Sequence, residues 1–262
     1  LSLEATFIFE VADRLSIDGC EERFRGEDNL VWTSYLDACR RLYVRPHRLH
    51  ITIHSPIPLS GGLGSSSACV VAGIAAAQAL NASGFDPKGS LDNVAPAIMG
   101  GLVSSFSDGR HTHSLRFEIA EGLSFVAIAP PYEVRTADAR KVMPQSVPTE
   151  TAVWQIGHCV AAVHALTTGD AGLLAVSCQD RLHEPYRSQL IADYEPLRRT
   201  ALAAGAAAYL ISGSGSTMLA VCDGRKAAER VACSVTNMVE NRVEGLWVRI
   251  LGTHTTGTTV EL

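Results

Sequence analysis

Hydrophobic and polar positions follow two different periods in the first part of the chain. Residues 3–11 (LEATFIFEV) are rich in strand-forming side chains, and residues 49–53 (LHITI) alternate between apolar and polar positions. Both segments therefore predict strands. Residues 29–42 carry apolar side chains at helical spacing, and residues 66–80 form an alanine-rich run that predicts a second helix.

Strands and helices continue to alternate through the rest of the chain. Strands are predicted at 101–107, 114–118, 123–129, 208–212, 217–222 and 246–251. Helices are predicted at 149–166, 171–180, 194–204 and 225–241, and residues 183–191 are expected to be irregular or a short helix. The order strand–turn–strand–helix–strand at the end is typical of an α+β sandwich. The pair Pro130-Pro131 indicates a junction, so we expect domains at 1–121 and 122–262.

Composition narrows the class of protein. Of 262 residues, 47% are hydrophobic and only 19% are charged, so the chain can bury a sizeable core and general disorder is excluded. The formal charge is 22 − 27 = −5. This charge balance gives no overall basic surface for nucleic acid or an anionic membrane, so we expect neither as a partner, and the alternative is a local basic site.

The cysteines and the apolar runs indicate the cellular compartment of the protein. The seven cysteines are odd in number and lack metal-ligand spacing, so we interpret them as small buried hydrophobes in a reducing cytoplasm. The longest strongly apolar stretches, residues 68–80 and 201–211, are too short to cross a bilayer. We therefore expect a cytoplasmic protein without a membrane span.

The segment 56–68 (PIPLSGGLGSSSA) is the most informative about chemistry. Three glycines and three serines stand between a predicted strand and a predicted helix. Glycines let backbone N–H groups approach a ligand, and a helix N-terminus adds unpaired donors and a positive dipole end. Together these features predict a phosphate cradle. The simpler alternative is a glycine-rich turn that only caps a helix. The segment matches neither the Walker A pattern nor the dinucleotide fingerprint.

This segment resembles the second motif of the GHMP kinases, P-x-x-x-G-L-G-S-S. The resemblance implies that ATP phosphates bind along the loop, with the hydroxyl of Ser66 on Mg²⁺. The implied ATP-binding residues are Pro58, Leu59, Ser60, Gly61, Gly62, Leu63, Gly64, Ser65, Ser66, Ser67 and Ala68.

Further segments resemble the homoserine kinases among the GHMP kinases, and the similarity runs from about residue 1 to 255. They are D-N-V-A-P-A at 92–97, T-A-D-A-R at 136–140, D-R-L-H-E-P-Y-R at 180–187 and S-G-S-G-S-T at 212–217. The last resembles the third GHMP motif, S-G-A-G-P-T. The family fold is α+β with two domains, an N-terminal α/β nucleotide-binding domain and a C-terminal ferredoxin-like α/β sandwich.

The implied activity is ATP- and Mg²⁺-dependent phosphorylation of the side-chain hydroxyl of L-homoserine. A free amino acid needs cations for its carboxylate, and arginine suits this through bidentate bonds. By resemblance, Arg140 and Arg187 hold the carboxylate, while Asp92 pairs with the ammonium group. The other implied site residues are Thr136, Asn93, Gly213 and Ser214 near substrate and Asn29 near adenine. The sequence is compatible with a homodimer and does not decide between a monomer and a dimer.

Two departures from the family leave alternatives open. The first GHMP motif is absent before Leu1, and the stretch leading to Asp92 is roughly fifteen residues short. The Mg²⁺-binding glutamate and a substrate histidine belong to that stretch in the family. We expect a longer polypeptide, with Asn and Asp before Leu1 and an insertion carrying Glu and His before Asp92. The alternatives are another GHMP kinase or an inactive homologue that binds ligands without turnover.

Overall fold

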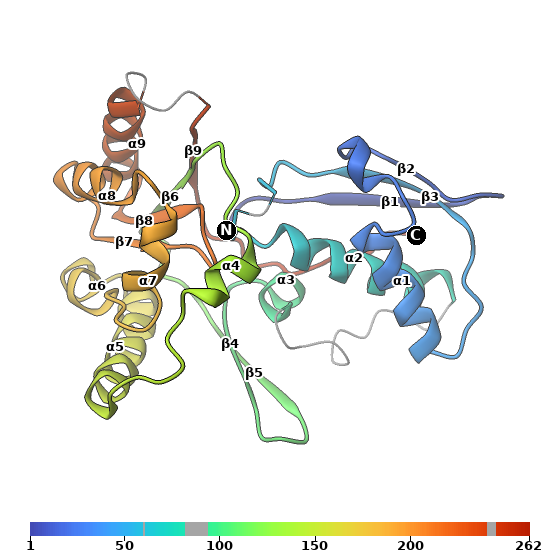
Figure 1. The fold of residues 1–262 in the computed structure, drawn as a ribbon, viewed down its shortest axis with the longest axis horizontal. Coiled ribbons are helices and arrows are strands. Elements are labelled where there is room, and N and C mark those ends of the chain that lie inside the picture. Colours follow the sequence, from blue (N-terminus) through green and yellow to red (C-terminus); the bar gives the residue numbers. More distant parts are fainter. Residues whose placement is uncertain (60, 82–93, 240–244) are drawn as a thin grey trace. The chain divides into compact units, whose positions relative to one another are not determined.

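The computed structural model describes residues 1–59, 61–81, 94–239 and 245–262 (Figure 1). The chain forms two compact units that exchange short segments. Unit 1 contains residues 1–2, 58–63 and 118–253, and unit 2 contains residues 3–57, 64–117 and 254–262. The two domains expected at residues 1–121 and 122–262 stay a prediction.

Unit 2 is built on a three-stranded sheet of order β1-β3-β2. β1 (Thr6–Val11) runs antiparallel to β3 (Leu49–His54), and β2 (Ser16–Asp18) runs parallel to it. The alternation in β3 is the expected one: Leu49, Ile51 and Ile53 are buried, and the residues between them are more exposed. These three side chains therefore belong to the core of the unit.

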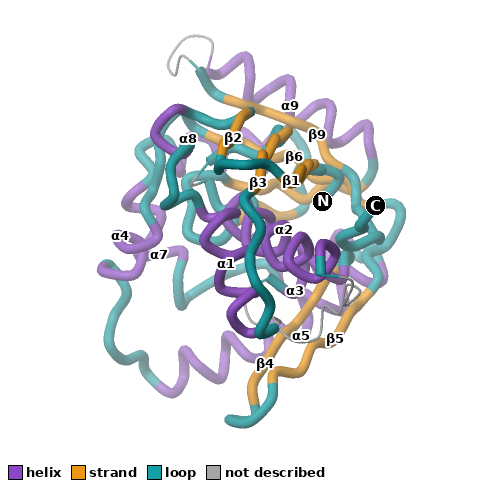
Figure 2. The backbone as a smooth tube through the Cα atoms, turned by 90° about the vertical axis from the view of Figure 1, so that its right-hand side faces the viewer, coloured by secondary structure: helices purple, strands orange, loops and turns teal. Residues whose placement is uncertain are grey.

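Helices α1 (Leu30–Arg41) and α2 (Ser65–Leu80) pack against each other in unit 2 (Figure 2). Gly73 makes their close approach possible, because a Cβ there would lie 2.4 Å from the carbonyl oxygen of Val31. Four of the seven buried residues of α2 are alanines. The unit is completed by η1 (Glu22–Phe24), α3 (Ala95–Met99) and a hairpin of β4 (Leu102–Ser107) and β5 (Thr112–Phe117).

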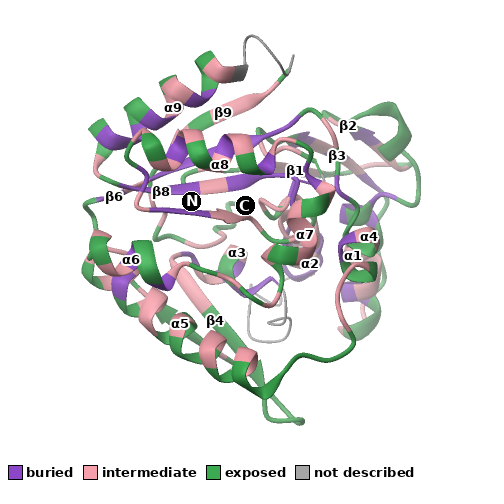
Figure 3. Cartoon of the chain, turned by 60° about the vertical axis from the view of Figure 1, so that its left-hand side comes forward, coloured by how far each residue is buried: buried purple, intermediate pink, exposed green. Residues whose placement is uncertain are grey.

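Unit 1 contains a four-stranded antiparallel sheet of order β7-β8-β6-β9. Its strands are β6 (Leu123–Ala129), β7 (Ala208–Ile211), β8 (Met218–Asp223) and β9 (Trp247–Leu251). Helices α8 (Tyr194–Ala203) and α9 (Arg225–Val239) pack against it, and buried residues of both helices and of the strands form one core cluster. Figure 3 marks buried stretches of α8, α9 and β8 in purple. The remaining elements are α4 (Thr136–Lys141), α5 (Thr149–Thr168), α6 (Ala171–Ser177), α7 (Glu184–Arg187) and η3 (Ser188–Leu190).

Every strand and every long helix predicted from the pattern is present, with ends shifted by a few residues. The expected helix at 171–180 is wrong at its end, since α6 stops at Ser177. Asp180 lies beyond that end because its carboxylate accepts hydrogen bonds from the amides of Leu182 and His183 and so forms a turn. The short elements β2 and α4 were not predicted.

None of the helices in the described part of the chain combines the length and the apolarity that a bilayer crossing requires.

Candidate functional site

Two glycine-rich segments of unit 1 are joined by hydrogen bonds although they are far apart in sequence. The amide of Thr217 donates to the carbonyl oxygen of Gly61 at 3.1 Å. The hydroxyl of Ser212 donates to the carbonyl oxygen of Gly62 at 3.0 Å. Residues 58–63 are therefore held by the turn at 212–217, which connects β7 to β8.

The contact between residues 58–63 and the turn at 212–217 requires a glycine at position 62. Its φ is +82°, and a Cβ there would lie 1.9 Å from the carbonyl oxygen of Ser212. Gly213 lies on the opposite side, with a φ of +57° and an added Cβ 3.2 Å from the carbonyl oxygen of Gly62. At these two positions, contact between backbones within the protein is what requires glycine.

Gly64 has a different role, because it begins α2. Its φ of +85° is left-handed, and a Cβ added there would meet no atom of the described residues within 4 Å. The first bond within the helix runs from the amide of Ala68 to the carbonyl oxygen of Gly64. The amides of Ser65 and Ser66 precede this first bond and belong to the first turn of the helix, whose amides have no carbonyl of the helix to donate to.

This first turn fits a phosphate group. It combines backbone donors, the positive end of the α2 dipole and serine hydroxyls beside a glycine that leaves the approach open. The fit for Mg²⁺ is narrower, because the described residues contain no group of three His, Cys, Asp or Glu side chains suited to a metal ion. Ser66 as the hydroxyl on Mg²⁺ stays a prediction.

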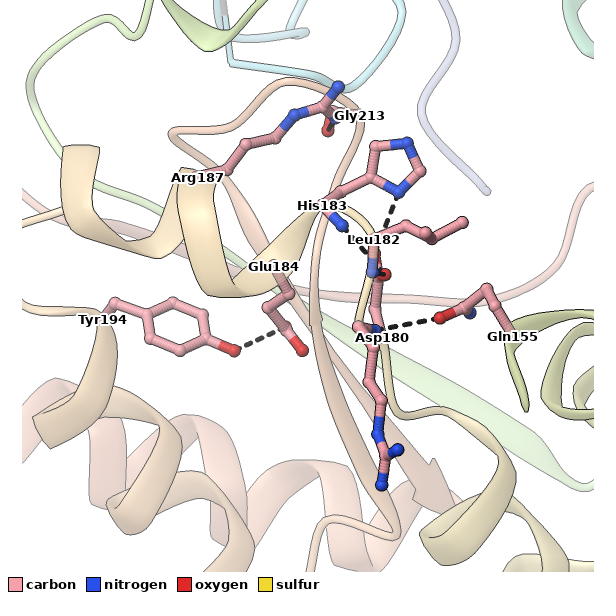
Figure 4. A network of polar contacts seen from close by, with 9 residues as sticks. Gln155, Asp180, Leu182, His183, Glu184, Arg187, Tyr194 and Gly213 are labelled. Carbon is pink, nitrogen blue, oxygen red and sulfur yellow. Dashed lines mark hydrogen bonds and ion pairs between the residues drawn. The ribbon is translucent and has the colours of Figure 1, made fainter. Parts of the chain in front are cut away.

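The segment 180–187 of unit 1 is fixed at its start by Asp180 (Figure 4). The Asp180 carboxylate accepts from the amide of Leu182 at 2.6 Å and from the amide of His183 at 3.0 Å. It also lies 3.2 Å from Nδ1 of His183. The amide of Arg181 donates to the side chain of Gln155 on α5 at 2.9 Å. These hydrogen bonds therefore hold the turn that precedes α7.

Arg187 lies at the end of α7, and its Nη1 donates to the carbonyl oxygen of Gly213 at 2.8 Å. Its Nε is buried and meets no hydrogen-bond partner among the described residues. Figure 4 shows the guanidinium reaching the turn that carries Gly213. A planar cation with one orphaned buried donor is suited to an additional anionic acceptor such as a carboxylate.

Thr136 and Arg140 both lie on α4, four residues apart and hence on one face of the helix. The hydroxyl of Thr136 is 3.4 Å from that of Ser214. Arg140 lies in the last turn and is exposed. Within unit 1, the structure thus brings together Thr136, Ser214, Gly213 and Arg187, with Arg140 on the helix that carries Thr136.

Asn29 lies in unit 2 and caps α1. Its side-chain oxygen accepts from the amide of Val31 at 2.8 Å, and its Nδ2 donates to the carbonyl oxygen of Phe24 at 2.7 Å. With 6% of its surface exposed, Asn29 contributes to the start of the helix, a role that the sequence analysis missed. A contact of Asn29 with adenine stays a prediction.

Three predicted site residues, Ser60, Asp92 and Asn93, lie outside the described residues. The expected insertion before Asp92 falls in the same part of the chain. The roles assigned to these residues, and the insertion itself, stay predictions.

One polar pair in this region was missed by the sequence analysis. The hydroxyl of Tyr194, the first residue of α8, donates to the carboxylate of Glu184. Burial raises the pKa of Glu184, and burial together with the neighbouring carboxylate raises the pKa of Tyr194. Sequence spacing could not have shown this pair, because it depends on how α7 meets α8.

Comparison with known proteins shows the family to which the chain belongs. Residues 29–101 match the GHMP kinases N terminal domain, and residues 162–241 match the GHMP kinases C terminal domain. A homoserine kinase of Clostridium botulinum (strain Kyoto / Type A2) is 30% identical over 97% of this chain and 88% of its own length. A homoserine kinase of Thermus thermophilus is 36% identical over 77% of this chain and 72% of its own length.

A solved structure shows the same fold. The crystal structure of homoserine kinase from Cytophaga hutchinsonii superposes with a TM-score of 0.86 at 28% identity, over 97% of this chain and 89% of that chain. The chain therefore belongs to the GHMP kinases, a class of small-molecule kinases, and has their two-domain α+β fold. The fold class expected from the sequence is confirmed.

Proposed function

We propose that this GHMP kinase phosphorylates L-homoserine. The observation that carries the proposal is the geometry around Arg187, whose guanidinium lies on the Gly213 carbonyl and keeps one buried N–H without a partner. A substrate with a free carboxylate supplies the missing acceptor, whereas a sugar or other uncharged alcohol offers none. The relatives named homoserine kinase support the same substrate class.

The proposed roles combine the contacts of the described side chains with the resemblance to the homoserine kinases. Arg187 and Arg140 bind the α-carboxylate of the substrate, and Thr136 adds a hydroxyl beside Ser214. Asp92 pairs with the ammonium group, with Asn93 beside it. These contacts orient the amino acid so that its side-chain hydroxyl is the group presented for reaction.

Residues 58–68 are proposed to bind ATP, with Ser66 as the hydroxyl on Mg²⁺ and Asn29 near adenine. ATP with Mg²⁺ supplies the phosphoryl group that the substrate hydroxyl receives. The amides of the first turn of α2 stabilise the negative charge of the phosphates. Phosphoryl transfer depends mainly on alignment and charge neutralisation, so no strong general base is required and Asp92 is assigned to binding.

The test is a substrate panel in a coupled ADP-release assay with ATP and Mg²⁺. L-homoserine should be turned over far better than mevalonate or galactose, and mass spectrometry should show one added phosphoryl group on the amino acid. L-2-aminobutyrate is the matched control, because it keeps the carboxylate and ammonium group but lacks the hydroxyl. It should inhibit competitively without turnover.

Two results would contradict the proposal. Equal or higher turnover of mevalonate would indicate another GHMP kinase. Binding of homoserine and an ATP analogue with no turnover would indicate an inactive homologue.

A further inference from the structure

The carboxylate of Glu184 lies where three elements of unit 1 meet. Glu184 begins α7, its side chain accepts the hydroxyl of Tyr194 at the start of α8, and the backbone amide of Ile211 at the end of β7 lies close enough to favour the ionised form of the carboxyl. Figure 4 shows the side chains of Glu184 and Tyr194 pointing toward each other beneath α7. One acidic side chain thus connects two helices and a strand.

The residues around Glu184 lie close in sequence to the two partners of the Arg187–Gly213 hydrogen bond. Glu184 and Arg187 are the first and last residues of the same four-residue helix. Ile211 precedes Gly213 by two residues, and Gly213 supplies the carbonyl oxygen that Arg187 contacts at 2.8 Å. The Glu184–Tyr194 pair therefore joins α7, which carries Arg187, to α8, and the ring of Tyr194 packs on Tyr209 of β7, the strand that leads to Gly213.

Glu184 and Tyr194 meet in buried surroundings, where placing polar groups costs desolvation free energy. Tyr194 has 8% of its surface exposed and stacks at a tilt with Tyr209, whose own side chain is buried in the core. A carboxylate and a hydroxyl in such a place often stabilise a fold no better than apolar side chains of the same shape. The pair is better explained by the geometry that it imposes on α7.

We propose that Glu184 and Tyr194 are positioning residues for the Arg187 guanidinium, and that they set the affinity for the substrate carboxylate. They act through the placement of α7 against the turn at 212–217. The effect on the substrate rests on the proposed function, whereas the effect on the Arg187–Gly213 contact does not.

The variants Y194F and E184Q test the proposal in the full-length protein. Y194F removes the hydroxyl and keeps the ring, and E184Q keeps an acceptor for Tyr194 while losing the charge. E195Q and Y43F are the matched controls, because Glu195 and Tyr43 are exposed. Melting curves establish that each variant is folded.

Y194F should raise the KM for homoserine about tenfold, the equivalent of losing one hydrogen bond to a charged group. The KM for ATP should change less than twofold. E184Q should show a smaller increase than E184A, since it retains part of the contact. In an R187A background, Y194F should have no further effect on the KM for homoserine, because the residue that it positions is gone.

Amide hydrogen exchange gives a second measurement that needs no substrate. In Y194F, the peptides covering 184–187 and 212–217 should exchange faster than in the wild type, and the controls should not differ. If the wild type turns over no homoserine, the proposed function fails, and the exchange result alone decides the inference. Unchanged exchange in Y194F, or equal increases in the KM values for homoserine and ATP, would overturn it.

Discussion

Arg187 and Arg140 share a predicted role, but they differ in their surroundings. Arg187 is partly buried and bonded to a backbone carbonyl, whereas Arg140 is exposed at the end of α4. A charged hydrogen bond away from bulk water is worth about 1.5–3 kcal/mol, or about tenfold to a hundredfold in binding. We therefore expect Arg187→Ala to raise the KM for homoserine by at least tenfold and to leave the KM for ATP nearly unchanged.

Arg140→Ala should also raise the KM for homoserine, by about tenfold, because its exposed guanidinium gains less from each bond. Arg199→Ala is the control. Arg199 is exposed, and its Nε lies 3.9 Å from Oε1 of Glu195, which is a long surface ion pair. Steady-state kinetics of the three variants separates the cases. Wild-type behaviour of both site variants at subsaturating homoserine would contradict the carboxylate site.

A single buried phenol should make unit 2 sensitive to alkali. Tyr35 is fully buried, its hydroxyl accepts from the amide of His47 at 2.8 Å, and burial raises its pKa to about 12. In the unfolded chain the group ionises near 10, so the free energy of unfolding should fall as pH rises from about 10 to 12. Urea denaturation of wild type and Tyr35→Phe at pH 9, 10 and 11 measures this effect. The variant should lose less stability with rising pH, and parallel curves would contradict the assignment.

At the scale of elements, Gly62 and Gly64 should behave differently although both have positive φ. Gly64→Ala should keep the fold at a cost of about 1–2 kcal/mol for the left-handed residue, because its Cβ meets no described atom. That Cβ would stand beside the first turn of α2, so affinity for an ATP analogue should fall sharply. Gly62→Ala should instead destabilise unit 1 by more, since its Cβ would overlap the carbonyl oxygen of Ser212.

Calorimetric titration with a non-hydrolysable ATP analogue and thermal melts followed by circular dichroism distinguish the two glycine variants. Unchanged affinity in folded Gly64→Ala would leave the loop as a simple helix cap. A Gly62→Ala protein as stable as Gly64→Ala would show that the contact with the turn at 212–217 contributes little.

Sequence pattern was sufficient for elements that are stabilised by their own periodicity. The alternation of β3 and the alanine-rich α2 are visible without any partner, and both occur where expected. The pattern missed β2, a three-residue strand that depends on pairing with β3. It also missed the short helix α4, whose six residues carry no readable period.

The same limit applies within the candidate site. The glycine- and serine-rich run and the two arginines stand out as residue types, so they could be named from the sequence. The contact of Glu184 with Tyr194 is a tertiary hydrogen bond, which no composition or spacing predicts because it depends on how separate elements meet. The cap made by Asn29 is a local hydrogen bond, and the preference for Asn at the start of a helix is the signal that could have predicted it.

At the scale of the molecule, net charge sets a simple expectation. With a formal charge of −5, the protein should not bind duplex DNA or RNA, because it carries no overall excess of Lys and Arg to neutralise phosphates and release their counterions. Gel mobility of a labelled 30-base-pair duplex, at about 50 mM salt where such binding is strongest, should not change on addition of the protein. A salt-sensitive shift would contradict this and would call for a search for a local basic face.

The exchange of segments between the units has a consequence for biosynthesis. Residues 58–63 lie between β3 and α2 of unit 2 but belong to unit 1. The hydroxyl of Ser212 that fixes Gly62 comes 150 residues later. At about 5–20 residues per second, a ribosome needs roughly 8–30 s to supply that partner. During this interval the glycine-rich loop emerges without the turn that shapes it, so the loop can take its final shape only after the chain has been extended past residue 212.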